Sequence, residues 1–269
     1  MSNEVGFNQQ YLKLKMQYEF LKEQCANQLE LYTHLVEVEG PNIKARYMML
    51  VGQYEHQVFE LKAEIARWKR RFTLRQAALN RGEKPNLVAI EVELDKEFAE
   101  YIEEVKKHIA EIKDASLLYH SAKLTEEEST ALRYAYLNAV KRLHPDLNPG
   151  LPQAAVELWN QIQEAYANKE WTQVKFLAGL VDNVVNGKTA FEATASGLES
   201  LEKGCEALRK RCAEIADKMA KTKSTLPFTY DVLLEDEELV RARQEQLNAQ
   251  IEALQNCITE YEELWNHGK

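Results

Sequence analysis

Glycine and proline are scarce in this chain. Its 269 residues include only 10 glycines and 6 prolines, while 29% of the residues are charged. Because these two residue types mark turns and break helices, their scarcity argues against a fold of many short strands. The composition therefore predicts an all-α protein with long helices.

Several catalytic and metal-binding motifs are also missing. The four cysteines, Cys25, Cys205, Cys212 and Cys257, form no C-x-x-C pair, which excludes zinc-ribbon sites. The sequence has no H-E-x-x-H pair, no phosphate-binding glycine loop and no G-x-S-x-G elbow. We therefore expect no enzyme and neither a metal nor a cofactor. Cys205 and Cys212 occupy apolar seam positions, which is more typical of buried hydrophobes than of a redox or metal pair.

The chain is acidic and has no long apolar run. Its net charge is −9 and its pI is near 5.4, which argues against nucleic-acid binding. No segment is apolar over the length of a bilayer, and the start lacks the basic and apolar pattern of a leader. We expect a cytoplasmic protein without an integral membrane segment. A basic cluster from Arg67 to Arg75 leaves membrane-surface binding open, although a solvated helix flank is the simpler interpretation.

The most informative stretch is residues 132–166, centred on His144-Pro145-Asp146. Apolar residues at spacings of three and four predict a helix on each side of this tripeptide. Proline disfavours the helical region for the residue before it, so the first helix ends at His144 and Asp146 falls in a loop. The turn-rich run at 148–150 then reverses the chain, giving an antiparallel helical hairpin with the tripeptide at its tip. The residues predicted to form its core are Leu132, Tyr136, Val140, Leu143, Trp159, Ile162 and Tyr166.

The run from Tyr136 to Gly150, together with Glu157 to Tyr166, resembles the J-domain of DnaJ-type co-chaperones. The resemblance covers residues 125–182 and implies that the tripeptide stimulates ATP hydrolysis by a DnaK-type heat-shock chaperone. This sequence has Asn138 where bacterial DnaJ proteins carry a cation, and the family's short first helix is not recognisable in residues 117–124. The residues to which the resemblance assigns chaperone binding are His144, Pro145, Asp146, Arg133, Lys141, Arg142 and Asn148.

The chemistry of these residues suits the same role. Arg133, Lys141 and Arg142 lie away from the apolar stripe and form a positive patch that would attract an acidic partner surface. Asp146, held in a turn, can accept a bidentate hydrogen bond from a partner arginine. Taken singly, each residue is also explained by helix termination or by a solvated helix face.

Long amphipathic segments precede the hairpin. Residues 8–39, 43–72 and 87–112 carry apolar residues at alternating steps of three and four, as in coiled-coil seams. A turn at Gly40-Pro41-Asn42 is expected to end the first of them. The three segments predict an antiparallel bundle or coiled coil.

Two further seams, at residues 198–219 and 240–265, predict a second antiparallel rod after the hairpin. The expected domains are thus an N-terminal three-helix bundle (1–116), a J-domain (117–182) and a C-terminal two-helix hairpin (183–269). Whether the seams close within one chain or between two chains, giving a homo-oligomer, stays open.

The sequence thus predicts a J-domain co-chaperone whose helical rods recruit a client protein that no residue identifies. The competing interpretation is a structural coiled-coil scaffold in which the J-like hairpin is degenerate and serves only to space the rods.

Overall fold

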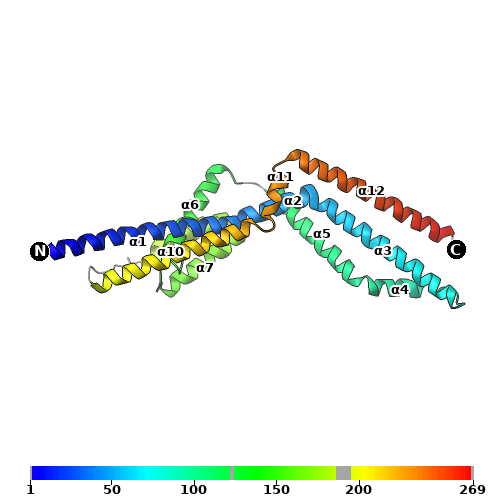
Figure 1. The fold of residues 1–269 in the computed structure, drawn as a ribbon, viewed down its shortest axis with the longest axis horizontal. Coiled ribbons are helices and arrows are strands. Elements are labelled where there is room, and N and C mark those ends of the chain that lie inside the picture. Colours follow the sequence, from blue (N-terminus) through cyan, green and yellow to red (C-terminus); the bar gives the residue numbers. More distant parts are fainter. Residues whose placement is uncertain (1, 122–123, 186–194, 268–269) are drawn as a thin grey trace. The chain divides into compact units, whose positions relative to one another are not determined.

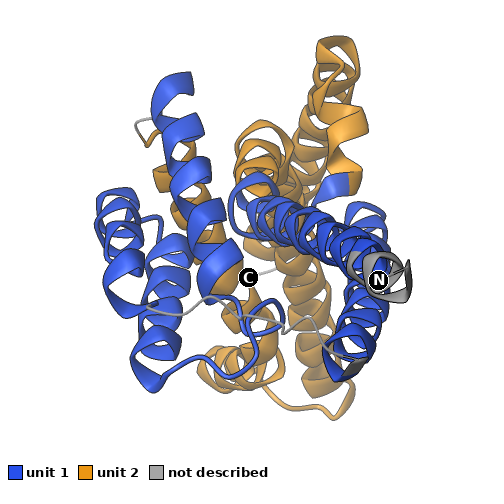
Figure 2. Cartoon of the chain, turned by 90° about the vertical axis from the view of Figure 1, so that its left-hand side faces the viewer, with its two compact units in different colours: residues 1–41, 122–228 blue, residues 42–121, 229–269 orange. Residues whose placement is uncertain are grey.

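The computed structural model describes residues 2–121, 124–185 and 195–267 (Figure 1). These residues form helices and connecting loops, and no strand occurs among them, so the all-α prediction is confirmed. The chain divides into two compact units, coloured separately in Figure 2. Unit 1 contains Met1–Pro41 and Ala122–Phe228, and unit 2 contains Asn42–Ser121 and Thr229–Lys269.

Both units combine segments that are far apart in the sequence. The helices of unit 1 are α1 (Ser2–His34), η1 (Leu35–Glu39), α6 (Glu126–Leu143), α7 (Gln153–Ala167), α8 (Trp171–Gly179), α9 (Val181–Val184) and α10 (Ala195–Lys223). The helices of unit 2 are η2 (Met48–Gly52), α3 (Gln53–Asn80), α4 (Leu87–Glu97), α5 (Ala99–Tyr119), α11 (Asp231–Leu234) and α12 (Glu237–His267). Two further elements, α2 (Gly40–Tyr47) and η3 (Phe228–Tyr230), begin in unit 1 and end in unit 2. This division differs from the three consecutive domains 1–116, 117–182 and 183–269 that were expected.

Helix α6 begins and ends where its local sequence requires. The Thr125 hydroxyl accepts a hydrogen bond from the Glu128 N–H at 3.2 Å, and the Glu128 carboxylate accepts one from the Thr125 N–H at 3.0 Å. This reciprocal pair is a capping box, for which the sequence Thr125-Glu-Glu-Glu128 is typical. At the other end the helix stops at Leu143, two residues before Pro145.

Helix α7 returns antiparallel to α6. Tyr136 in the middle of α6 packs against Tyr166 at the end of α7, with tilted rings whose centroids are 4.2 Å apart. His144, after the end of α6, lies near Trp159 in the first half of α7, with ring centroids 5.3 Å apart. Helices α8 and α9 pack on this pair. The structure buries all seven residues of the expected core, Leu132, Tyr136, Val140, Leu143, Trp159, Ile162 and Tyr166.

Helix α10 lies along α1 in the same direction (Figure 1). Gly204 faces the ring of Tyr18, and the next residue, Cys205, points its thiol toward the Leu14 carbonyl at 4.0 Å. The predicted seam of α10 is buried from Leu201 to Ile215, including Cys205 and Cys212, which are free thiols in the apolar core. The seam predicted at residues 87–112 is fully buried only at Ile90 and Leu94, whereas Leu87, Tyr101 and Ile109 are exposed. A seam shows that a helix buries one face, but heptad spacing alone does not select the partner. The seams at 198–219 and 240–265 were expected to pair with each other. Instead, α10 packs on α1 in unit 1 and α12 packs on α3 in unit 2.

Helix α3 is the centre of unit 2. Helix α12 runs parallel to it, because Glu55 pairs with Arg243 at 2.7 Å and the more C-terminal Phe72 packs on Trp265, with ring centroids 5.3 Å apart. Helices α4 and α5, separated at Phe98, run back along α3. The expectation of antiparallel rods therefore holds for α3 with α4 and α5, whereas the pairs α1–α10 and α3–α12 are parallel.

The turn expected at Gly40-Pro41-Asn42 is absent from the structure. Helices α1, η1, α2, η2 and α3 follow one another without a loop. The Gly40 N–H bonds to the Leu35 carbonyl five residues earlier, which is the wider π-helical pattern. Pro41 follows this turn directly, and the wider turn accommodates the missing N–H and the ring, which a regular α-helix disfavours. The π-helical turn η1 thus precedes the position of the predicted break, and a second such turn, η2, follows after α2.

The basic cluster from Arg67 to Arg75 is largely paired with carboxylates of α4. Arg67 lies 2.6 Å from Asp95, Arg71 lies 2.6 Å from Glu91, and Arg70 bonds Glu97 through two nitrogens. These pairs explain the cluster as part of the α3–α4 contact and weaken the interpretation as a membrane-binding surface.

Gly204 tests the parallel packing of α1 and α10. A Cβ atom at this position would lie 2.7 Å from Cε2 of Tyr18, which is closer than van der Waals contact permits. We expect Gly204→Ala to lower the free energy of unfolding by about 1–3 kcal/mol. Helix propensity alone would predict the opposite sign, since alanine is favoured over glycine within a helix by about 1 kcal/mol. Urea denaturation followed by circular dichroism measures the change.

The Tyr18→Ala background provides the matched comparison. Without the ring, Gly204→Ala should become stabilising, because only the gain in helix propensity remains. Gly179→Ala in α8 is the control, since an added Cβ there meets no atom within 4 Å. A stabilising Gly204→Ala in the otherwise unchanged chain would contradict the observed packing.

Candidate functional site

The tripeptide His144-Pro145-Asp146 lies in the loop between α6 and α7. The N–H groups of Leu147 and Asn148 both donate to the His144 carbonyl at 3.0 Å, which closes a tight turn. Leu147 is 1% exposed and anchors the turn in the core of unit 1. Pro145 and Asp146 stay exposed. The turn is therefore anchored by the buried Leu147, while Pro145 and Asp146 at its tip face solvent.

Asn148 ties this loop to two helices. Its side-chain amide donates to the carbonyls of Lys141 and His144, at 3.1 Å and 3.2 Å. The Lys141 carbonyl lies in the last turn of α6, where carbonyls lack a partner within the helix. The side-chain oxygen of Asn148 accepts a hydrogen bond from Lys22 of α1 at 2.7 Å. Asn148 thus has a structural role, whatever it does toward a partner.

His144 packs against Trp159 and orders the backbone of the loop. Its Nδ1 accepts a hydrogen bond from the Asp146 N–H at 3.1 Å, so the neutral ring carries its proton on Nε2. Burial lowers the pKa of His144 below its ordinary value of 6.5; the nearby Asp146 opposes this shift and Arg211 adds to it. The ring is accordingly neutral at pH 7.

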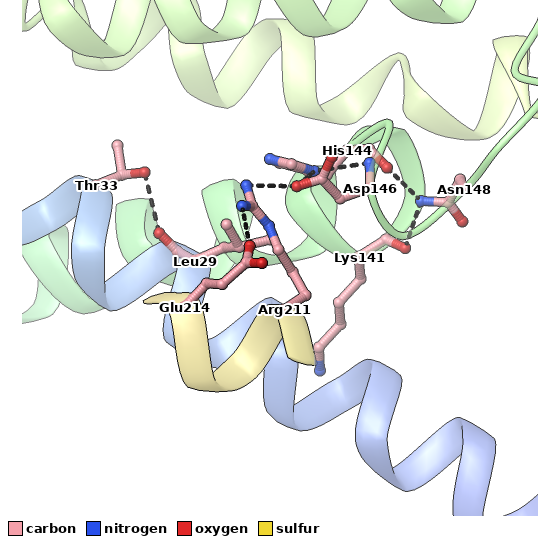
Figure 3. A network of polar contacts seen from close by, with 8 residues as sticks. All are labelled: Leu29, Thr33, Lys141, His144, Asp146, Asn148, Arg211 and Glu214. Atoms are coloured by element: carbon pink, nitrogen blue, oxygen red, sulfur yellow. Dashed lines mark hydrogen bonds and ion pairs between the residues drawn. The ribbon is translucent and has the colours of Figure 1, made fainter. Parts of the chain in front are cut away.

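The Asp146 carboxylate has a partner within the chain. Arg211 of α10 places Nη2 at 2.5 Å from Asp146 and Nη1 at 3.2 Å from Glu214, so its guanidinium bridges two acids (Figure 3). The Asp146 side chain is 38% exposed and that of Arg211 is 30% exposed. The Nε atom of Arg211 is buried without a hydrogen-bond partner among the described residues. The carboxylate is thus accessible to solvent but occupied.

The cations near the end of α6 are paired as well. Lys141 lies 2.7 Å from Glu23 of α1, and Arg142 pairs with Asp182 of α9. Both acids are well exposed, with 63% and 79% of their side-chain surface accessible. The positive patch expected from the sequence is therefore compensated by acids of the same unit.

Arg133 has a different environment. It bonds both oxygens of Glu30 in α1, at 2.8 Å and 3.1 Å. Glu30 is only 4% exposed and is the one buried charged residue among those whose burial the structure describes. The two-pronged contact raises the pKa of Arg133, mainly through its hydrogen bonds to Glu30. Arg133 is thus the counter-ion that allows α1 to dock on α6.

The sequence did not identify the residues that complete this site. They are Lys22, Glu23 and Glu30 of α1, Arg211 of α10, and the anchor Leu147. Charged residues beside a heptad seam select its partner helices, so Glu23 and Glu30, seven positions apart, were a usable signal. That signal could be interpreted only with the knowledge that α1 meets α6.

Comparisons with known proteins do not assign the chain to a family. No family model, no curated protein and no solved structure matches it. Within the described ranges, no group of three or more His, Cys, Asp or Glu side chains is arranged to hold a metal ion. No helix in the part of the chain that the structure describes has the length and apolar character to cross a bilayer.

The buried carboxylate of Glu30 gives a stability prediction. Arg133→Gln removes its counter-ion, so we expect the free energy of unfolding to fall by about 3 kcal/mol, the lower end for a broken buried pair because Arg133 is itself 39% exposed. Lys141→Gln is the matched control, and its exposed pair with Glu23 should contribute less than about 1 kcal/mol. Urea denaturation compares the two variants. Equal effects would show that Glu30 is not a buried charge.

The ring of His144 gives a pH prediction. Since its pKa is depressed by folding, the unfolded chain binds more protons near pH 6, and the stability of unit 1 should fall as the pH drops below about 6.5. His144→Gln should reduce this decline but not abolish it, because burial also lowers the pKa of His34 in the same unit. NMR titration should show Arg211→Gln raising the pKa of His144 and Asp146→Asn lowering it further. Opposite shifts in these two variants would contradict the observed geometry.

Proposed function

We propose that this protein is a J-domain co-chaperone that binds a DnaK-type heat-shock chaperone and stimulates its ATPase. The observation that carries the proposal is the position of His144-Pro145-Asp146, in an ordered turn between the antiparallel helices α6 and α7 with Pro145 and Asp146 exposed. Leu147 and Asn148 hold the backbone of this loop in one conformation, so the Asp146 side chain starts from a fixed position. Preorganisation of this kind lowers the entropic cost of binding.

The chemistry assigned to each residue follows from its position. Asp146 would accept hydrogen bonds from an arginine of the chaperone. Lys141 and Arg142, in the last turn of α6, would meet acidic groups of the chaperone. His144 keeps the loop backbone in place through the Asp146 N–H and acts as a positioning residue. ATP hydrolysis itself would take place in the partner.

Recruitment of a client protein is assigned to the helices outside α6–α9. In the family that the hairpin resembles, regions beyond the J-domain select the client, and here these regions include all of unit 2. A cytoplasmic location belongs to the same proposal. The seams of α1 and α10, and those of α3 and α12, close within one chain. No described residue identifies the client.

A structural scaffold is the second candidate, and one observation favours it. The four charged residues of the expected surface, Arg133, Lys141, Arg142 and Asp146, are all paired with acids or a base of the same unit. The expected place of the family's first helix also departs from the pattern. Residues 117–119 belong to α5 in unit 2, and residues 122–123 lie outside the described part. Such a hairpin would only join the long helices.

Asp146→Asn separates these two functions. A single-turnover ATPase assay with a DnaK-type chaperone should show stimulation by the unchanged protein and its loss in this variant, because the amide binds a guanidinium without charge assistance. The melting temperature should change little, since a partly exposed ion pair contributes about 0–1 kcal/mol. His144→Gln should also lose stimulation.

Asp217→Asn is the matched control, because it makes the same charge change at an exposed position of α10. It should stimulate as the unchanged protein does. If the unchanged protein gives no stimulation, the scaffold is the function that stands. If Asp146→Asn retains full stimulation, the activity does not pass through the His144-Pro145-Asp146 loop and the role assigned to Asp146 is wrong.

A further inference from the structure

The Asp146 carboxylate is already bound by an arginine, which is the ligand that the proposed chaperone contact would require. Arg211 is 65 positions away in sequence, so the contact arises from the packing of α10 in unit 1. We infer that α10 is an internal competitor for the loop: Arg211 occupies Asp146 in the free chain, and a partner arginine must displace it. This inference rests on the proposed co-chaperone function and adds a mode of regulation to it.

The position of Arg211 is set by the apolar seam of α10. Leu208, Cys212 and Ile215 are buried in the core of unit 1, and Arg211 projects beside them toward the loop (Figure 3). Docking of α10 on α1 therefore delivers the guanidinium to Asp146. Any movement of α10 away from α1 would also withdraw it.

The contact is suited to release. Arg211 is shared between Asp146 and Glu214, so it keeps one acidic partner when the other is taken. Its buried Nε has no hydrogen-bond partner among the described residues, which leaves the bound state incompletely satisfied. Both side chains of the Arg211–Asp146 pair are about a third exposed, so water and salt can compete for it.

The neighbouring pairs point to the same self-bound state. Glu23 and Asp182 cover Lys141 and Arg142, and both acids are well exposed and exchangeable. The pair of Arg133 with the buried Glu30 is the opposite case, since it fastens α1 to α6. Release of the loop thus involves the Arg211 contact of α10, while α1 stays docked.

Arg211→Gln in the full chain tests the competitor. In the single-turnover ATPase assay, the concentration for half-maximal stimulation should fall by up to about five-fold, because the displaced pair is partly exposed and therefore weak, with the same maximal rate. Amide hydrogen exchange in the absence of chaperone should become faster at His144 and at residues 146–148. Arg211→Lys keeps the charge but not the planar fork, so it should show a smaller effect in the same direction.

Arg209→Gln is the matched control, because it removes the same charge from an exposed position two residues earlier on α10. It should change neither readout. If Arg211→Gln leaves both the half-maximal concentration and loop exchange unchanged, the competitor is overturned and the co-chaperone function stands. If neither the unchanged protein nor Arg211→Gln stimulates the ATPase, the co-chaperone function fails and the competitor role fails with it.

Discussion

The docking of α1 against both α6 and α10 is the contact on which the geometry of the candidate site depends. Through it, Glu30 reaches Arg133, Lys22 reaches Asn148, and α10 is placed where Arg211 meets Asp146. Burial of the Glu30 carboxylate is tolerable only because a two-pronged guanidinium satisfies both of its oxygens. The loop is thus ordered by a helix that lies more than a hundred residues earlier in the chain.

The distribution of charge explains why an acidic chain shows no free basic face at this site. With 43 acidic and 34 basic residues, excess carboxylates are available to pair with exposed cations. Lys141 and Arg142 are examples, and Arg67 and Arg71 follow the same rule in unit 2. The charge of one helix therefore does not predict the charge of the surface to which that helix belongs. Its net effect depends on which helices pack beside it.

Local signals in the sequence were sufficient for part of this structure. The cap at Thr125 and the stop before Pro145 act within a few residues, so the bounds of α6 could be predicted. Heptad spacing also identified the buried faces of α1 and α10. It could not say that these two faces meet, or that they meet in parallel, because apolar stripes are interchangeable partners. Arg211 was missed for that reason, since its role exists only after the pairing is known.

The magnitudes of the ion pairs separate those that build the fold from those that can take part in binding. A partly exposed pair such as Asp146–Arg211 contributes about 0–1 kcal/mol, so breaking it hardly affects folding. The Glu30–Arg133 pair differs because loss of one partner leaves a charge in the interior, at a cost of about 3 kcal/mol or more. The binding energy of a well-placed partner guanidinium can exceed the cost of breaking the Asp146–Arg211 pair. It is less suited to offset the cost of breaking the Glu30–Arg133 pair. Among the residues expected to meet a chaperone, Asp146 is therefore available for exchange and Arg133 is part of the fold.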